Sequence, residues 1–253
     1  YNSMGPALEH VNFTVKPGQL VALLGGSGSG KSTIAHLLAR FYDVSSGRIT
    51  VDGVDIRDVT LASLRKNVVT AQQDIFLFSS TIRDNIAYGA VDADMEQIVT
   101  VAKAAHLHDF IESLPDGYDT WVGERGLTLS GGEKQRLAIA RTLLINPSVL
   151  ILDDSTSSVD AETEHLIRQA LNRLIEGRTT FIITHRLPII KNADLILMLK
   201  DGQVAEQGKH SELMDMKGLY YQVYQSQLAS TDGSAENLSE LSVEQPLEEG
   251  AKE

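Results

Sequence analysis

Residues 20–33 of the chain read LVALLGGSGSGKST. An apolar run ends at Gly25, and four residues separate that glycine from Gly30, Lys31 and Ser32. A strand, a glycine-rich turn and a helix in this order form a phosphate-binding loop, because successive backbone N–H groups and the positive end of the helix point at phosphate oxygens. In such a loop Lys31 places its charge at the β- and γ-phosphates, and the Ser32 hydroxyl is a Mg²⁺ ligand. A flexible linker would lack the flanking apolar strand and helix.

A second segment supplies a carboxylate partner for this loop. Residues 149–154 read Val-Leu-Ile-Leu-Asp-Asp, which is typical of a buried central strand that ends in acidic residues. Ligands of α/β sheets bind at the carboxyl ends of the strands, so we expect Asp153 to lie near the loop and to hold Mg²⁺ through water. The two segments together predict a site for a nucleoside triphosphate and Mg²⁺.

The rest of the sequence predicts an α/β fold, a P-loop NTPase core with a mostly parallel sheet, an N-terminal antiparallel β subdomain and an inserted α-helical subdomain. We expect one ATP-binding domain over residues 1–229, with the helical insertion at about 82–145. Strands are expected at 11–15, 19–24, 149–153, 179–184 and 195–199, with a hairpin about the Asp52-Gly53 turn. Helices are expected at 31–41, 93–105, 107–114, 131–145 and 161–175.

Composition narrows the function classes further. The chain has 253 residues, with 22 Lys and Arg against 34 Asp and Glu, and its net charge of −12 argues against direct binding to nucleic acid. It contains no cysteine, which excludes disulfides, thiolate metal sites and thiol nucleophiles. Its apolar runs reach about five residues, far below the roughly 18 needed to span a bilayer, and no leader pattern opens the chain. A cytoplasmic location is therefore expected.

The last part of the sequence, residues 230–253, has a different composition. It carries seven acidic residues and one basic residue, a net charge of −6, and no aromatic residue. Such a segment cannot bury enough apolar surface to offset the entropy of ordering, so we expect a disordered acidic tail.

A third segment, residues 129–136, reads Leu-Ser-Gly-Gly-Glu-Lys-Gln-Arg. Ser130 and Glu133 have the spacing of a capping box, so Ser130 is expected to cap a helix whose free N–H groups and two glycines face outward as a second anion site. Here the chain resembles the nucleotide-binding domain of an ATP-binding cassette exporter of the multidrug and lipid type. Residues 81–89 and 120–126 are similar to other segments of such exporters.

The resemblance implies a head-to-tail dimer in which the loop of one domain and the Ser130 segment of a second nucleotide-binding domain enclose ATP and Mg²⁺. It also implies a transmembrane domain as partner, a place at the cytoplasmic face of the membrane, and that the chain is one domain of a longer protein. The residues it assigns to nucleotide binding are Tyr1, Gly25, Gly28, Ser29, Gly30, Lys31, Ser32, Thr33, Gln73, Ser130, Gly131, Gly132, Gln135, Asp160 and His185. The expected metal ligands are Ser32, Gln73 and Asp153, and the expected catalytic residues are Asp154, His185, Gln73 and Lys31.

Among these residues, Asp154 departs from the family pattern, which has glutamate at this position. The shorter side chain sets its carboxylate roughly 1–1.5 Å further back, and a displacement of about 1 Å can cost on the order of 100-fold in rate. We therefore expect normal Mg·ATP binding and slow hydrolysis. Asp154 beside an intact Ser130 segment favours a heterodimer with one degenerate site, whereas the presence of His185 leaves a homodimer open. The alternative to a motor domain is a regulatory half that completes the active site of its partner.

Overall fold

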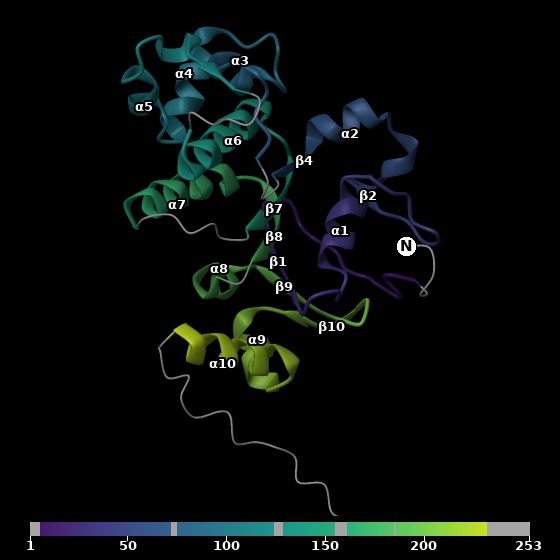
Figure 1. Ribbon diagram of the computed structural model, residues 1–253. Coiled ribbons are helices and arrows are strands. Elements are labelled where there is room, and N and C mark those ends of the chain that lie inside the picture. Colours follow the sequence, from purple (N-terminus) through teal and green to yellow (C-terminus); the bar gives the residue numbers. More distant parts are fainter. Residues whose placement is uncertain (1–5, 72–74, 124–128, 155–160, 185, 232–253) are drawn as a thin grey trace, which may run out of the picture.

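The computed structural model describes residues 6–71, 75–123, 129–154, 161–184 and 186–231. At its centre lies a six-stranded sheet in the order β10-β9-β1-β8-β7-β4, with helices on both faces (Figure 1). The five strands from β9 to β4 are parallel, and β10 runs antiparallel to β9. This arrangement confirms the expected mostly parallel sheet. The strands are β1 (Leu20–Gly25), β4 (Val68–Ala71), β7 (Val149–Asp154), β8 (Thr179–Thr184), β9 (Leu195–Lys200) and β10 (Gln203–Gly208).

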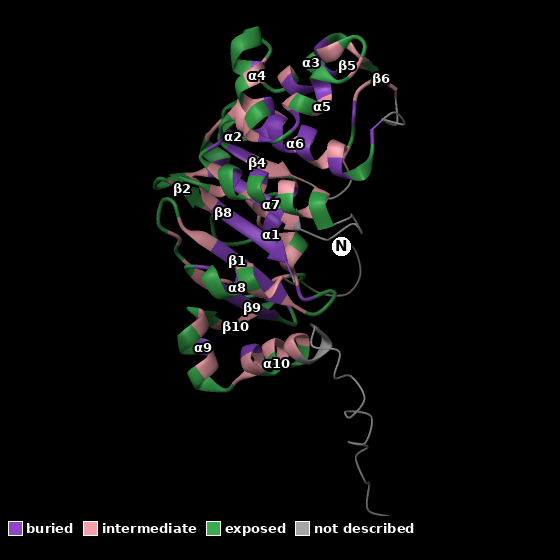
Figure 2. Ribbon diagram, turned by 90° about the vertical axis from the view of Figure 1, so that its left-hand side faces the viewer, coloured by how far each residue is buried: buried purple, intermediate pink, exposed green. Residues whose placement is uncertain are grey.

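The central strands are apolar on both faces, as expected when helices cover each side of a parallel sheet. In β1, Val21 and Leu23 contact one hydrophobic core, and Ala22 and Leu24 contact the other. All four side chains are buried, and Figure 2 shows the same burial along β8. The sheet therefore holds the carboxyl ends of β1, β7 and β8 rigidly at one edge.

One face of the sheet is covered by α1 (Lys31–Leu38) and α2 (Leu61–Asn67). Between these helices lie the hairpin of β2 (Thr50–Val51) and β3 (Val54–Asp55) and the short helix η1 (Ile56–Asp58). Asp52 and Gly53 have φ values of 51° and 81°, as a tight two-residue hairpin turn requires, so the predicted hairpin is confirmed.

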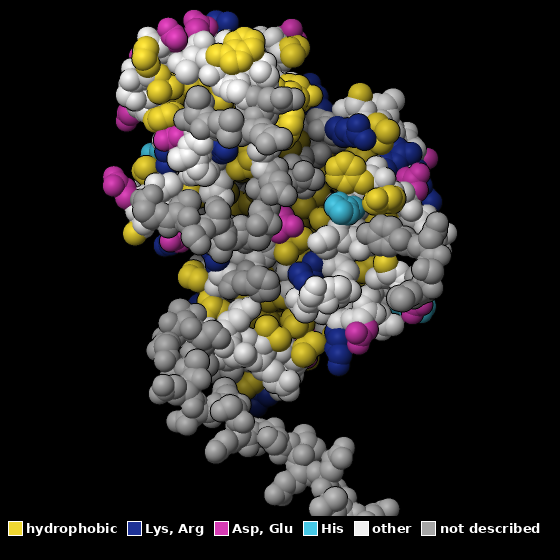
Figure 3. Space-filling view, in the orientation of Figure 1, with side chains coloured by type: hydrophobic (Ala, Val, Ile, Leu, Met, Phe, Trp, Pro, Cys, Tyr) yellow, Lys and Arg dark blue, Asp and Glu magenta, His cyan; other side chains and the backbone are white. Residues whose placement is uncertain are grey.

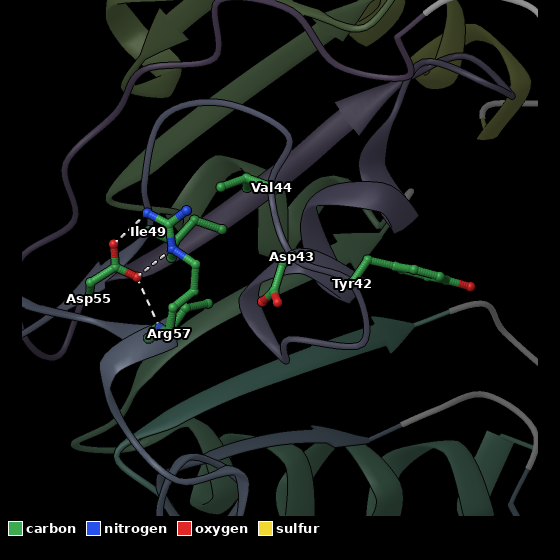
Figure 4. A pocket seen from close by; sticks show the side chains of 7 residues that line it. Tyr42, Asp43, Val44, Ile49, Asp55 and Arg57 are labelled. Atoms are coloured by element: carbon green, nitrogen blue, oxygen red, sulfur yellow. Dashed lines mark hydrogen bonds and ion pairs between the residues drawn. The ribbon is translucent and has the colours of Figure 1, made fainter. Parts of the chain in front are cut away.

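Arg57 fastens this hairpin to the following helix (Figure 4). Its guanidinium donates to both carboxylate oxygens of Asp55, at 3.1 and 2.8 Å, and to the Gly47 carbonyl at 3.2 Å. The two side-chain hydrogen bonds to Asp55, together with one from the Arg57 backbone N–H, lower the pKa of Asp55 to about 2.

The other face carries the larger hydrophobic core and most of the helices (Figure 1). The described residues between β4 and β7 form a helical insertion between two strands that pair with each other in the sheet. The insertion contains β5 (Ser80–Thr81), α3 (Ile82–Ala87), α4 (Met95–Ala104), α5 (His108–Glu112), η2 (Gly117–Asp119), β6 (Trp121–Val122) and α6 (Gly131–Ile145). The remaining helices are α7 (Ala161–Ile175), α8 (Leu187–Asn192), α9 (His210–Met216) and α10 (Leu219–Thr231). Within the described part of the chain, no helix combines the length and hydrophobicity needed to cross a bilayer.

The prediction of a strand at residues 11–15 is wrong. Val11, Phe13 and Val15 are half-buried against the core beside α1, and the residues between them are exposed, but the segment pairs with no strand of the described structure. The ring centroid of Phe13 lies 6.1 Å from that of Phe181 in β8. The alternation of apolar and polar residues therefore reflects an extended segment with one buried side, and the segment is not hydrogen-bonded into a sheet.

The helix expected at 31–41 ends earlier, at Leu38. Arg40 takes a left-handed conformation with φ of 51°, and the Phe41 N–H closes the helix by donating to the His36 carbonyl at 2.9 Å. The Arg40 guanidinium then donates to the carbonyls of Ile56 and Val59, at 2.9 and 3.1 Å. The helix thus ends in a local hydrogen-bonded cap, and the Arg40 side chain ties that end to residues 56–59.

Candidate nucleotide-binding site

Two glycines of the loop between β1 and α1 occupy positions where a side chain would be strained, because both have a positive φ. A Cβ atom on Gly25, whose φ is 145°, would overlap the Leu199 carbonyl oxygen of the neighbouring strand. Gly30 precedes the first residue of α1 with φ of 106°, and a Cβ there would lie 2.5 Å from Leu8 Cδ2. Both glycines let the backbone fold tightly against its surroundings, so that the N–H groups of the loop and of the first turn of α1 gather at one place.

Lys31 holds the loop in this shape. Its ammonium donates to the carbonyls of Gly25 and Gly26, both at 2.8 Å. Burial lowers the pKa of Lys31, and the negative charge of Asp153 partly offsets that shift. The lysine and the acidic strand end are thus in electrostatic contact across the site.

The strand register explains how Asp153 reaches this place. Leu23 of β1 and Asp153 of β7 are both aligned with Ile183 of β8, the strand between them. Neighbouring strands lie about 4.8 Å apart, so Asp153 lies roughly 10 Å from the backbone of β1 at the same level of the sheet. The side chain is half-buried at the carboxyl end of its strand.

The polar residues of the loop offer oxygen ligands of the kind that Mg²⁺ prefers. Ser32 is exposed on the first turn of α1, and Thr33 beside it is half-buried. The Oγ of Ser29 is buried and has no hydrogen-bond partner among the described residues. No group of three or more His, Cys, Asp or Glu side chains in the described parts could hold a metal ion. The donor set of Ser32 and Asp153 therefore fits Mg²⁺ that takes its other oxygens from phosphate and water.

The Ser130 segment forms the predicted capping box at the start of α6. The Ser130 N–H donates to Glu133 Oε2 at 2.7 Å, and the Glu133 N–H donates to Ser130 Oγ at 3.3 Å. The expectation that both following glycines face outward is wrong for one of them. Gly131 is exposed with open space around it, whereas a Cβ on the buried Gly132 would overlap Thr163 Cγ2 of α7. Gly132 thus allows α6 to pack closely on α7.

Ser130 and Lys31 belong to helices on opposite faces of the sheet. α6 packs on the large core with α7, and α1 packs on the smaller core (Figure 1). Gln135, the remaining predicted contact of this segment, is half-buried on α6. One chain therefore presents two separate groups of free backbone N–H donors.

Four predicted site residues lie outside the described residues: Tyr1, Gln73, Asp160 and His185. Asp154 is the last residue of β7, and its side chain also lies outside the description. Their roles stay predictions. The structure brings together the loop glycines, Lys31, Ser32 and Asp153.

Sequence reasoning missed an aromatic surface, which we define as Phe76, Phe78 and Tyr88. The rings of Phe78 and Tyr88 stack with centroids 3.9 Å apart, and Phe76 meets Phe78 edge-on at 5.0 Å. Phe76 and Tyr88 are 61% and 57% exposed, which is unusual for such large side chains. In Figure 3, further hydrophobic side chains reach the surface at this helical end of the molecule, interspersed with acidic ones.

Arg141 of α6 lies against this aromatic surface. The guanidinium carbon is 5.6 Å from the centroid of the Phe78 ring and 5.7 Å from that of Tyr88. Burial lowers the pKa of Arg141. The signal in the sequence was the number of aromatic residues between 76 and 88, but their arginine partner lies more than 50 residues away.

A family model described as ABC transporter matches residues 8–157, more than half of the chain. The chain belongs to the ABC transporter family. The matched region contains the phosphate-binding loop, the Ser130 segment and the Asp153 strand, so the family resemblance read from these motifs is confirmed.

Several ABC transporter proteins are closely similar to this chain. The ATP-dependent lipid A-core flippase of Legionella pneumophila (strain Paris) is 52% identical over 227 residues, which are 90% of this chain and 39% of the flippase. Multidrug resistance protein pgp-1 of Caenorhabditis elegans is 52% identical over 222 residues, 88% of this chain and 17% of that protein. A bacterial Atm1-family ABC exporter, solved with ATP bound, superposes with a TM-score of 0.82 at 48% identity, covering 90% of this chain and 40% of that one. The chain thus spans about two fifths or less of these relatives.

Proposed function

We propose that this chain is the ATP-binding and ATP-hydrolysing motor domain of an ABC exporter. The observation that carries the proposal is the arrangement of the loop around Lys31 opposite Asp153 at the carboxyl edge of the sheet. Two of the three ammonium hydrogens of Lys31 bind loop carbonyls, which leaves the third for a phosphate oxygen of ATP. When bound, Mg²⁺ would neutralise phosphate charge between Ser32 and Asp153.

The proposed active unit is a head-to-tail dimer. The backbone N–H donors of the loop and those at Ser130 belong to helices on opposite faces of the sheet. One triphosphate therefore cannot bind both groups of donors in the same chain. A second nucleotide-binding domain brings its own Ser130 segment to the ATP held on this loop. Exposed Gly131 leaves room for the close approach of phosphate to the N-terminus of α6.

The proposed chemistry assigns each remaining site residue a role. Asp154 orients or deprotonates the attacking water, His185 contacts the γ-phosphate, and Gln73 reaches Mg²⁺. Asp160 crosses the dimer interface, and Tyr1 stacks on adenine. Because Asp154 is shorter than the glutamate it replaces, hydrolysis of the ATP bound to this loop is slow. For comparison, removing a general base altogether lowers a reaction rate roughly 10²–10⁴-fold.

Two further features of the proposal concern partners. A transmembrane domain docks on the aromatic surface, which would place the domain at the cytoplasmic face of a membrane and explain why Phe76 and Tyr88 are exposed. In the favoured form of the proposal, the second nucleotide-binding domain is a different chain. The Ser130 segment of this chain then completes the ATP site on that partner, where hydrolysis is faster. The alternative to a motor domain is a regulatory half that binds ATP and closes but hydrolyses little ATP itself.

The experiment that tests the proposal is nucleotide binding by a matched pair of lysine variants. Lys31→Ala removes the charge at the phosphates, so we expect at least about a 100-fold loss of Mg·ATP affinity in isothermal titration. Lys103→Ala, at an exposed position of α4, should bind as the unchanged chain does. Equal affinity of the two variants would refute the site.

A further inference from the structure

We infer that Arg141 is a positioning residue that ties the aromatic surface to α6 and thereby sets the position of the Ser130 cap. The inference deepens the proposed function and rests on it, because the cap is the half-site that this chain lends to its partner. The physical basis is a set of contacts that joins three separate segments: residues 76–78, α3 and α6.

The guanidinium of Arg141 donates to two segments at once. Its Nε donates to the Asn85 carbonyl at 2.8 Å, and one terminal nitrogen donates to Asn85 Oδ1 at 3.1 Å. The other terminal nitrogen donates to the Phe76 carbonyl at 3.2 Å. The planar fork of arginine can satisfy three acceptors in fixed directions, which lysine cannot do with a single ammonium.

Asn85, the acceptor at the centre of this arrangement, is completely buried. Its side-chain NH₂ donates to the carbonyls of Phe78 and Thr81, both at 3.0 Å, and its Oδ1 accepts from the Phe78 N–H at 2.9 Å. With Arg141 on the same oxygen, every donor of the amide is used and its oxygen accepts twice. A fully satisfied buried network has one arrangement, so residues 76–85 and α6 move together.

The aromatic surface covers the outer side of this network. Arg141 lies against the rings of Phe78 and Tyr88, and the exposed Phe76 and Tyr88 separate it from solvent only in part. A partner that covers these rings excludes water from the guanidinium, and cation–π and hydrogen-bond interactions strengthen when water is excluded. Occupancy of the aromatic surface therefore stiffens the contact between residues 76–88 and α6.

The helix transmits this constraint to the cap. Arg141 lies 11 residues after Ser130, about 16 Å along an α-helix at 1.5 Å per residue. At the far end of α6, a Cβ on Gly89 would overlap the Ile145 side chain, so the segment after α3 also packs directly on the helix. With its carboxyl half held at two places, α6 directs its N-terminal N–H groups in one orientation.

The test compares Arg141→Met with Arg141→Lys and with a control, Arg168→Met. Methionine keeps an unbranched apolar stem and removes the fork, and lysine keeps the charge without the fork. Arg168 is 60% exposed on α7 and pairs only with Glu164 in the described structure, at 3.0 Å, so its variant changes an arginine that joins no such network. Tyr88→Leu removes one ring while leaving all three Arg141 hydrogen bonds.

Three measurements are made on the full 253-residue chain: Mg·ATP affinity, self-association with a non-hydrolysable ATP analogue by sedimentation velocity, and amide hydrogen exchange. For Arg141→Met we expect affinity within twofold, a concentration for half-association raised at least tenfold, and faster exchange both at residues 76–88 and at the Glu133 amide. Arg141→Lys should be intermediate, Tyr88→Leu should show a smaller change of the same kind, and Arg168→Met should show none.

The inference is overturned if Arg141→Met exchanges faster only at 76–88 while the Glu133 amide and the association are unchanged. If that variant does not fold, Arg141→Lys and Tyr88→Leu decide, and unchanged association and exchange in both would equally overturn it. If the unchanged chain does not self-associate with the analogue, the homodimer form of the proposal fails, whereas the exchange at Glu133 still decides the role of Arg141.

Discussion

The adjacent glycines at the start of α6 allow a sharp test of the packing described above. Gly131 and Gly132 occupy the first turn of the same helix, so alanine changes helix propensity in the same direction at both. Only at Gly132 does the new methyl group meet Thr163 Cγ2, and the branched threonine side chain has few alternatives to move to. We expect Gly132→Ala to lower the free energy of unfolding by about 1–3 kcal/mol, as overpacking of a core does.

The assay is thermal or urea unfolding of both variants. A loss of 1–3 kcal/mol corresponds to roughly 2–12 °C in Tm for a domain of this size. Gly131→Ala should leave Tm unchanged or raise it slightly, because open space surrounds that position.

A second substitution identifies the atom responsible. Thr163→Ser removes only the methyl group that meets the new side chain and keeps the hydroxyl, so it should restore most of the stability that Gly132→Ala loses. The reasoning is refuted if Gly132→Ala is as stable as Gly131→Ala, or if Thr163→Ser gives no recovery in the double variant.

Two further predictions concern catalysis and pH. If this chain is the degenerate half, Asp154→Glu should raise the rate of ATP hydrolysis many-fold in a single-turnover assay, and Asp154→Asn should change it little. An unchanged rate with glutamate and a large loss with asparagine would instead show that Asp154 is an effective base. The pKa of Asp55 is lowered to about 2 by hydrogen bonds from Arg57, so its carboxylate stabilises the fold above its ordinary value near 3.8, and this contribution is lost as pH falls toward 2. Urea midpoints measured across that range should therefore fall less steeply for Asp55→Asn than for the unchanged chain, and parallel slopes would contradict the assignment.

Local patterns predicted the parts of the fold that depend on neighbouring residues. The capping box at Ser130 requires only two side chains three residues apart, and it formed as expected. The Asp52-Gly53 hairpin turn likewise depends on the backbone preferences of the turn itself. The phosphate-binding loop belongs to this group, because its glycines, lysine and serine are consecutive or nearly so.

Features that depend on distant segments were not predictable in the same way. The orientation of Gly132 is decided by α7, about 30 residues further on, and nothing in its own helix distinguishes it from Gly131. Residues 11–15 were predicted to form a strand because apolar and polar residues alternate there. The alternation places one side of the segment against the core, but pairing requires a free strand edge, which local sequence does not reveal. The contact between Asn85 and Arg141 joins residues 56 positions apart.

The order of strands in the sheet has a consequence for how the chain acquires its shape during synthesis. β1 precedes both of its neighbours, β8 and β9, by more than 150 residues, since those two strands lie within residues 179–200. β1 therefore has no neighbouring strand in the central sheet until residues 179–200 have left the ribosome, and closing so long a loop is slow. A nascent chain that stops before β8 would carry the complete phosphate-binding sequence and still lack the framework on which it folds.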